Sequence, residues 1–124
     1  MLKKLSLLTA MTCLLSGCTM TWETSDFTVM SPKPLDFTKR QYKVGKEVEG
    51  GSFGPIILTL GAPVRYGKPT LNDAVSNALQ QEKCAVGLTN INAQLVDRHF
   101  GFGKWGWIVK GNLLLDTTKP GCNN

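Results

Sequence analysis

The sequence predicts a small α+β domain in which one helix covers an antiparallel sheet of about four strands, in the order strand, strand, helix, strand, strand. Three observations predict this fold. One segment has the apolar spacing of an amphipathic helix, two later segments alternate apolar and polar residues, and an earlier apolar run is bounded by Gly and Pro. A length of 124 residues suits one domain. The hydrophobic content of 42% excludes a disordered chain and a multispanning membrane protein.

The first two predicted strands lie between residues 42 and 60. The stretch from Tyr42 to Val48 favours β structure and ends before two glycines, Gly50 and Gly51. The apolar run from Phe53 to Leu60 follows, and its Gly and Pro boundaries favour a buried strand over a helix. Residues 66–69 predict a turn.

The predicted helix runs from about Leu71 to Gln81. Thr70 is a good N-cap, and Asp73 resembles a capping box with Asp in place of Glu. The apolar residues follow the spacing i, i+3, i+4, i+7, i+8: Leu71, Ala74, Val75, Ala78 and Leu79. One face of this helix should therefore pack on the sheet.

The last two predicted strands have a side-chain period of two. Apolar residues alternate with polar residues from Ile91 to Val96 and again from Trp105 to Leu115. The segment from His99 to Lys104 contains two glycines and predicts the loop of a hairpin. The C-terminal residues 117–124 predict a loop.

The first 18 residues have the organisation of a signal peptide. Lys3 and Lys4 provide a positive start, and an apolar run from Leu5 to Leu14 is too short to span a bilayer as a stable helix. The segment Leu15-Ser16-Gly17-Cys18 resembles the lipobox of bacterial lipoproteins.

This resemblance implies a lipid anchor at Cys18. In that family the Cys thiol takes a diacylglyceryl group, the leader is cut between Gly17 and Cys18, and the new amine is acylated. Three acyl chains make a durable anchor. Thr19 follows the Cys where family members that stay in the inner membrane tend to have Asp, so the resemblance implies the outer membrane.

The expected chain has three parts: residues 1–17 form a lipoprotein signal peptide, residues 18–38 a lipid-anchored tether, and residues 39–124 a small periplasmic α+β domain. Ser, Thr and Pro residues are frequent in the tether, and Ser31-Pro-Lys-Pro34 favours an extended path. A short strand at residues 27–30 is the alternative to an unstructured path within the tether.

The positive charge does not indicate nucleic-acid binding. Loss of the leader removes two lysines and lowers the formal charge from +5 to +3. The densest basic group is interpreted as a solvated strand or tether, with anionic lipid or glycan phosphate as the alternative contact: Lys39, Arg40, Lys43 and Lys46. No basic helix or known motif accompanies it, so no nucleic-acid partner is expected.

The cysteines predict one disulfide. Cys13 leaves with the leader and Cys18 is lipidated, so Cys84 and Cys122 remain in an oxidising compartment. The alternatives are a metal site or a redox pair. A metal site lacks ligands because His99 is the single histidine and no CxxC or CxxH spacing occurs. No metal and no cofactor are expected.

A Gly-spaced aromatic segment is the candidate partner surface: Phe100, Phe102, Trp105 and Trp107. One interpretation is a hairpin tip that binds a protein partner, a glycan or the membrane face. The other places the two tryptophans in the core and the glycines at turns or bulges.

Two polar pairs are candidates for catalysis. Asp97 and His99 would share a strand face, but no nucleophile motif such as GxSxG accompanies them. Glu47 and Glu49 resemble a glycosidase pair, although charges on an edge strand commonly serve to prevent aggregation. The sequence therefore predicts no catalytic residues and no enzyme.

The expected function is a non-catalytic binding or accessory module of the cell envelope. It would be anchored in the outer membrane through its lipid, face the periplasm, and bind an envelope protein or glycan. The alternatives are a cell-wall hydrolase that uses either polar pair, and a surface-displayed protein for exclusion or host contact.

The layout of the folded part also resembles small bacterial lipoprotein families such as the TRL-like family. In that family a Gly-rich strand precedes a helix with an Asp-Ala step, and two strands follow. The corresponding stretches here are Leu60–Pro63, Asn72–Val75 and Val109–Gly111. This resemblance implies the fold alone.

Overall fold

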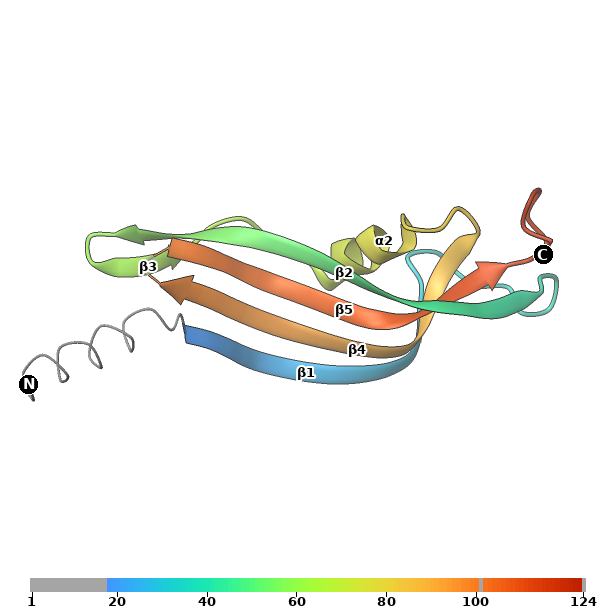
Figure 1. Ribbon diagram of the computed structural model, residues 1–124, viewed down its shortest axis with the longest axis horizontal. Helices are drawn as coiled ribbons and strands as arrows, with labels where there is room; N and C mark the ends of the chain where they lie inside the picture. Colours follow the sequence, from blue (N-terminus) through green and yellow to red (C-terminus); the bar gives the residue numbers. More distant parts are fainter. Residues whose placement is uncertain (1–17, 101, 124) are drawn as a thin grey trace, which may run out of the picture.

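The computed structural model describes residues 18–100 and 102–123, with side chains from residue 26 onward. Within these residues, five antiparallel strands form one long sheet in the order β1-β4-β5-β2-β3, and helix α2 packs on one face (Figure 1). The elements are β1 (Cys18–Met30), β2 (Tyr42–Thr59), β3 (Ala62–Arg65), α2 (Leu71–Leu79), β4 (Ala85–Phe100) and β5 (Phe102–Asp116). The α+β class is confirmed, and the sheet has one more strand than predicted.

Strand β2 is one continuous element where the sequence predicted two. Gly50 and Gly51 lie inside it, paired with Val109 and Ile108 of β5. A Cβ atom at Gly50 would lie 2.2 Å from the carbonyl oxygen of Ala74 in α2. This glycine therefore allows the helix to approach the strand closely, and it does not mark a turn.

The turn between β2 and β3 consists of Leu60 and Gly61. Both have positive φ angles, 49° and 84°, as a two-residue type I′ hairpin requires. Thr59 pairs with Ala62 on either side of the turn, and Pro63 pairs with Leu58. Strand β3 was missed because a proline argues against a strand, but Pro63 lies in an edge strand, where proline is tolerated.

The prediction of a tether over residues 18–38 is wrong for residues 18–26, whereas the short strand considered at residues 27–30 is present as the end of a longer strand. Cys18–Met30 is strand β1, which pairs with β4 from Cys18 opposite His99 to Met30 opposite Leu88. This segment contains four Thr residues and one each of Trp, Phe and Val, all of which favour strands, and β4 offers an edge on which they can pair. A connection without helix or strand follows over residues 31–41.

Helix α2 has the predicted start and a slightly earlier end. The Thr70 hydroxyl accepts a hydrogen bond from the Asp73 backbone N–H at 3.1 Å and donates to the Asp73 carboxylate at 2.7 Å. The helix ends at Leu79 rather than Gln81. Its apolar face completes a core of nine buried residues: Val48, Ala74, Val75, Ala78, Leu88, Ile91, Ala93, Val109 and Leu113.

Strands β4 and β5 extend through most of the predicted hairpin loop. His99 pairs with Gly103, and Phe100 pairs with Phe102. A Cβ atom at Gly103 would lie 2.0 Å from the carbonyl oxygen of Arg98, so this glycine permits close contact between the strands. Gly103 thus continues the pairing that a loop at this position would have interrupted.

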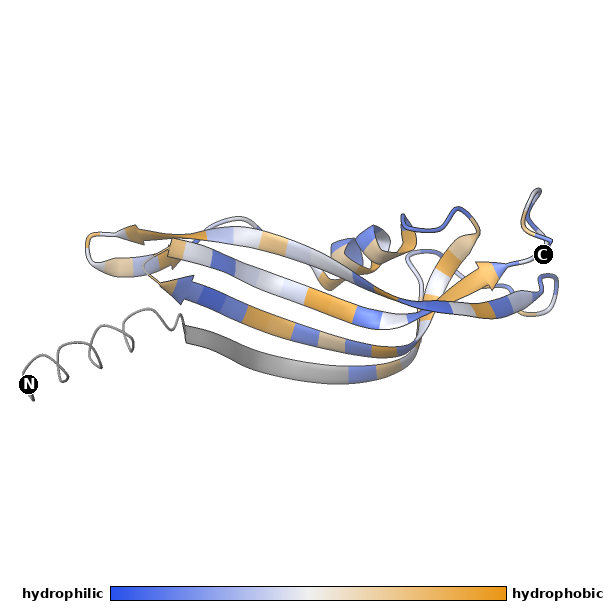
Figure 2. Ribbon diagram, viewed as in Figure 1, coloured by the Kyte–Doolittle hydropathy of each residue, from blue (hydrophilic) through white to orange (hydrophobic). Residues whose placement is uncertain are grey.

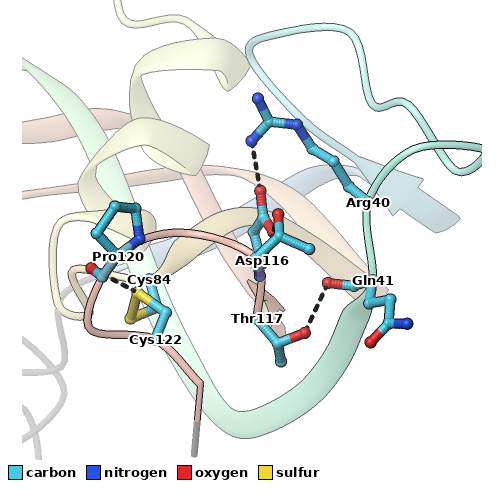
Figure 3. Close-up of a disulfide and its surroundings, with 8 residues drawn as sticks. Arg40, Gln41, Cys84, Asp116, Thr117, Pro120 and Cys122 are labelled. Atoms are coloured by element: carbon cyan, nitrogen blue, oxygen red, sulfur yellow. Dashed lines mark hydrogen bonds and ion pairs between the residues drawn. A yellow bond between two sulfur atoms is a disulfide. The ribbon is translucent and has the colours of Figure 1, made fainter.

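The opposite end of the sheet is held by a disulfide and an ion pair (Figure 3). Cys84 and Cys122 are joined as predicted, with their Cα atoms 5.7 Å apart and 38 positions between them in sequence. Beside them, the buried Asp116 carboxylate accepts a hydrogen bond from Arg40 at 2.6 Å. The Thr117 hydroxyl donates to the Gln41 carbonyl at 3.1 Å, so the C-terminal loop is tied to the start of β2.

Candidate functional site

Asp97, which is buried, joins two basic side chains at the end of the sheet where β1 begins. Arg65 donates to one carboxylate oxygen of Asp97, with an Nε–Oδ2 distance of 2.7 Å and a second bond from Nη2. His99 Nδ1 lies 2.6 Å from the other oxygen, Oδ1. The predicted proximity of Asp97 and His99 is confirmed, and Arg65 is a third member that the sequence analysis did not include.

This ionic cluster of Arg65, Asp97 and His99 requires the end of the sheet to curl. Arg65 belongs to β3 and Asp97 to β4, and two strands lie between them. Across a flat sheet they would be about 14 Å apart, because neighbouring strands are spaced by about 4.8 Å. An arginine side chain spans about half of that distance, so β3 must lean over the sheet face for the bonds to form.

The cluster keeps Asp97 ionised. Burial acts to raise the pKa of this carboxyl group, but the hydrogen bonds and charges of Arg65 and His99 outweigh burial and lower the pKa below 3.8. Both carboxylate oxygens are occupied by these partners. Asp97 therefore orients the imidazole of His99 and anchors Arg65.

A small, mainly apolar cavity of about 250 Å³ lies beside the cluster and is lined by Arg65, Leu95, Val96, Asp97 and Trp105. These lining residues bring no hydroxyl or thiol group to the cavity. An oriented histidine is one part of an acyl-transfer site, but a nucleophile must stand within hydrogen-bond reach of it. The arrangement supports a structural role for the cluster more directly than catalysis.

The aromatic segment divides into two parts. Phe100 and Phe102 are exposed at the hairpin end, whereas Trp107 packs against the core. Trp105 is partly buried, and its indole N–H donates to the Tyr66 carbonyl at 3.0 Å. The surface interpretation thus fits the phenylalanines, and the core interpretation fits Trp107.

The second polar pair lies on an open surface. Glu47 and Glu49 are exposed on one face of β2, opposite Asn112 and Lys110 of β5. Glu49 forms an ion pair with Lys110 at 3.2 Å. Both carboxylates are exposed, and that of Glu49 is already paired with a cation, so this pair offers no enclosed site for a substrate.

A larger cavity, of about 550 Å³, lies at the disulfide end between the 31–41 connection and the end of α2. Lys33, Arg40 and Lys119 line it together with Asp36 and Asp116. Arg40 belongs to the basic group of the sequence analysis, and its guanidinium is already bound to Asp116. Lys39, Lys43 and Lys46 are exposed, as expected for a solvated segment.

Two features at the end of the sheet where β1 begins were missed by sequence reasoning. The ion pair between Arg65 and Asp97 joins residues 32 positions apart, and no local pattern signals it. The exposed turn at Leu60 was assigned to a buried strand because the run before it is apolar. The available signal was Gly61, which follows Leu60 directly and suits a residue with positive φ.

Some predicted sites lie outside the residues that the structure describes. The leader, including Cys13 and the cleavage residue Gly17, is outside the described residues, and Cys18 is described by its backbone alone. Within residues 18–100 and 102–123, no group of three or more His, Cys, Asp or Glu side chains is placed to hold a metal ion. No helix in that part of the chain has the length and apolar character needed to cross a bilayer.

Comparison with known proteins gives no match: no family model, curated protein or solved structure is similar to this chain at a significant level.

Proposed function

We propose that this chain is an outer-membrane lipoprotein, anchored through Cys18, whose periplasmic domain is a non-catalytic binding module of the cell envelope. The observation that carries the proposal is the order of features at the N-terminus: two lysines, a short apolar run, small residues and then Cys18. The disulfide between Cys84 and Cys122 supports an oxidising compartment such as the periplasm.

The surface of the domain favours a binding role over a catalytic one. Helix α2 contacts β2, β4 and β5 on one face, and the side chains of the other face form a row of polar and charged groups around Asn92, Gln94, Arg98 and Lys110. Such a surface suits an envelope protein or a glycan as partner. Asp97, the buried carboxylate of the ionic cluster, is already engaged by two basic side chains.

The anchor is tested with a Cys18→Ser variant. We expect the variant to remain uncleaved or to leave the membrane fraction, because the substituted residue cannot take the diacylglyceryl group. Inhibition of lipoprotein signal peptidase should make the precursor of the unaltered chain accumulate. Normal maturation of the variant would disprove the anchor.

The binding role is tested by crosslinking in living cells, followed by identification of the captured envelope protein or glycan. A domain that captures neither would contradict the proposal. Protease treatment of intact cells tests orientation, because a periplasmic domain is protected and a surface-displayed domain is digested.

The hydrolase alternative rests on the oriented pair of Asp97 and His99. It requires the purified chain to cleave peptidoglycan, and the activity must fall on His99→Gln or Glu49→Gln substitution. We expect no cleavage by the unaltered chain.

A further inference from the structure

One cross-strand row of residues runs through all five strands at the end of the sheet where β1 begins. Cys18 pairs with His99, His99 with Gly103, Gly103 with Ile56, and Ile56 with Arg65. The start of β1 and the two hairpin turns therefore lie at the same end of the molecule (Figure 1). Strand β1 begins at Cys18 itself, so no flexible linker separates the predicted anchor from the sheet.

Among the residues that the structure describes, none beyond this row is charged. In the sequence, residues 57–64 and 100–102, which follow this row in both hairpins, are all uncharged. Phe100 and Phe102 are 62% and 78% exposed, Leu58 is 52% exposed, and Leu60 at the tip of its turn is fully exposed. Figure 2 shows hydrophobic colours at the β2–β3 turn. Turns usually carry Gly, Asn, Asp or Ser, so large apolar side chains here call for a second surface to cover them.

The height of these side chains above the row follows from strand geometry. A strand advances by about 3.3 Å per residue, so Phe100 lies about 3 Å beyond the level of Cys18 and Leu58 about 7 Å beyond it. An amphipathic element buries its apolar side about 5–10 Å into the boundary between headgroups and acyl chains. The β2–β3 turn therefore reaches the depth of that boundary whenever Cys18 lies at its edge, and Phe100 enters it in part.

Basic residues occupy the next pair of positions along β4 and β5, on the side of the row away from the turns. Arg98 and Lys104 pair with each other across β4 and β5, and both are exposed. The Lys104 ammonium group lies 4.3 Å from the centre of the Phe53 ring. The nearby carboxylate of Asp97 is paired with Arg65 and is in hydrogen-bond contact with His99. An apolar layer followed by a cationic layer is complementary to acyl chains followed by lipid phosphates.

We infer that this end of the sheet is a second membrane contact, which docks on the phospholipid leaflet that holds the acyl chains of Cys18. The turns around Leu60 and Phe102 enter the interface, and Arg98 and Lys104 meet the phosphate groups. The sheet then stands with its long axis away from the membrane, and the disulfide end points outward. This inference rests on the proposed lipidation of Cys18.

Depth measurements on the full chain test the docking. The chain is extracted from the membranes of the cells that make it and is reconstituted in vesicles of phosphatidylethanolamine and phosphatidylglycerol. A fluorescent probe is attached through Leu60→Cys, and a matched control carries it through Phe37→Cys, which is 64% exposed in the 31–41 connection at the other end. The chain without an added cysteine gives the labelling background, because Cys84 and Cys122 are disulfide-bonded.

We expect the emission of the probe at position 60 to shift to the blue and to be quenched by brominated acyl chains, while the probe at position 37 stays in water. Equal, water-like signals at both positions would overturn the inference. A probe at position 60 that is shielded in cells but exposed in pure vesicles would also overturn it, in favour of a protein partner that covers the turns.

Charge reversal tests the basic layer separately. The double variant Arg98→Glu with Lys104→Glu should reduce quenching at position 60 about twofold in anionic vesicles. The matched control, Lys33→Glu with Lys39→Glu, lies near the other end and should leave quenching unchanged. Equal quenching in both double variants would contradict the role of the basic layer.

The same preparation distinguishes this inference from the anchor on which it rests. The mass of its N-terminal peptide shows whether Cys18 carries acyl chains. A peptide without them would disprove the anchor whatever the probe reports. An acylated peptide together with a water-exposed probe at position 60 would disprove the docking alone.

Discussion

At the scale of the residue, Asp116 shows how burial is compensated by hydrogen bonds. The Thr118 hydroxyl and backbone N–H donate to one oxygen of its carboxylate at 2.5 and 2.9 Å, and Arg40 donates to the other. These bonds, led by that from the Thr118 side chain, outweigh desolvation and lower the pKa of Asp116 from 3.8 to about 2. The folded protein therefore favours the ionised form more strongly than the unfolded chain does.

This shift predicts a defined pH dependence. Because the folded-state pKa of Asp116 is the lower one, its contribution to the free energy of unfolding is complete above pH 3.8 and is lost as the pH falls toward about 2. We expect Asp116→Asn to reduce the slope of unfolding free energy against pH within this window. Urea titrations at several pH values measure it. Thr118→Val should reduce the slope in part, and an unchanged slope in Asp116→Asn would contradict the assignment.

Substitutions at the two ends of the aromatic segment should change the free energy of unfolding by very different amounts. Trp107 packs against the core, so Trp107→Ala should lower the free energy of unfolding by about 3 kcal/mol. Phe102 is exposed, so Phe102→Ala should change it by less than about 0.5 kcal/mol. Urea denaturation of both variants measures this difference. A stable Trp107→Ala variant would place the indole outside the core.

At the scale of the element, the fit between α2 and β2 depends on a missing side chain. A Cβ atom at Gly50 would overlap the Ala74 carbonyl and come within 2.7 Å of the Ala78 Cβ atom, so the helix can rest on the strand because position 50 has no side chain. The same contact buries Ala74 and Ala78 fully.

We therefore expect Gly50→Ala to destabilise the domain by about 1–3 kcal/mol, the usual cost of overpacking. Gly45→Ala is the matched control on the same strand, because its Cβ atom would meet the flexible Leu115 side chain at 3.1 Å rather than backbone. The control should lose clearly less stability in thermal or urea denaturation. Equal losses would mean that the cost comes from strand propensity instead of helix contact.

Features set by neighbouring residues could be predicted from the sequence, whereas features set by distant contacts could not. Helix α2 was predictable because its N-cap at Thr70 and its apolar spacing are local properties. The length of β2 was not, because Gly50 in a strand has the same local signature as a glycine in a turn. The pair of Asp97 and His99 was predictable from strand alternation, whereas Arg65 joins it through the curl of the whole sheet.

At the scale of the whole molecule, the disulfide is expected to contribute much of the stability of a domain with a small core. It closes a loop of 38 positions, for which the chain-entropy model gives roughly 4 kcal/mol. The double variant Cys84→Ser with Cys122→Ser should lose up to this amount of unfolding free energy, and reduction of the unaltered chain should have the same effect. A loss well below about 1 kcal/mol would show that the surrounding contacts already hold the C-terminal loop.

The order of the strands has a further consequence for how the chain is made. Strand β5 comes last in sequence but lies between β4 and β2, so it joins the β1–β4 pair to the β2–β3 pair. Until β5 has left the ribosome, the edges of β4 and β2 that pair with it remain without their partner strand. The sheet therefore closes only when the final strand arrives. For the exported lipoprotein proposed above, we expect this delay to keep the emerging chain in the unfolded state that passage through a translocation channel requires.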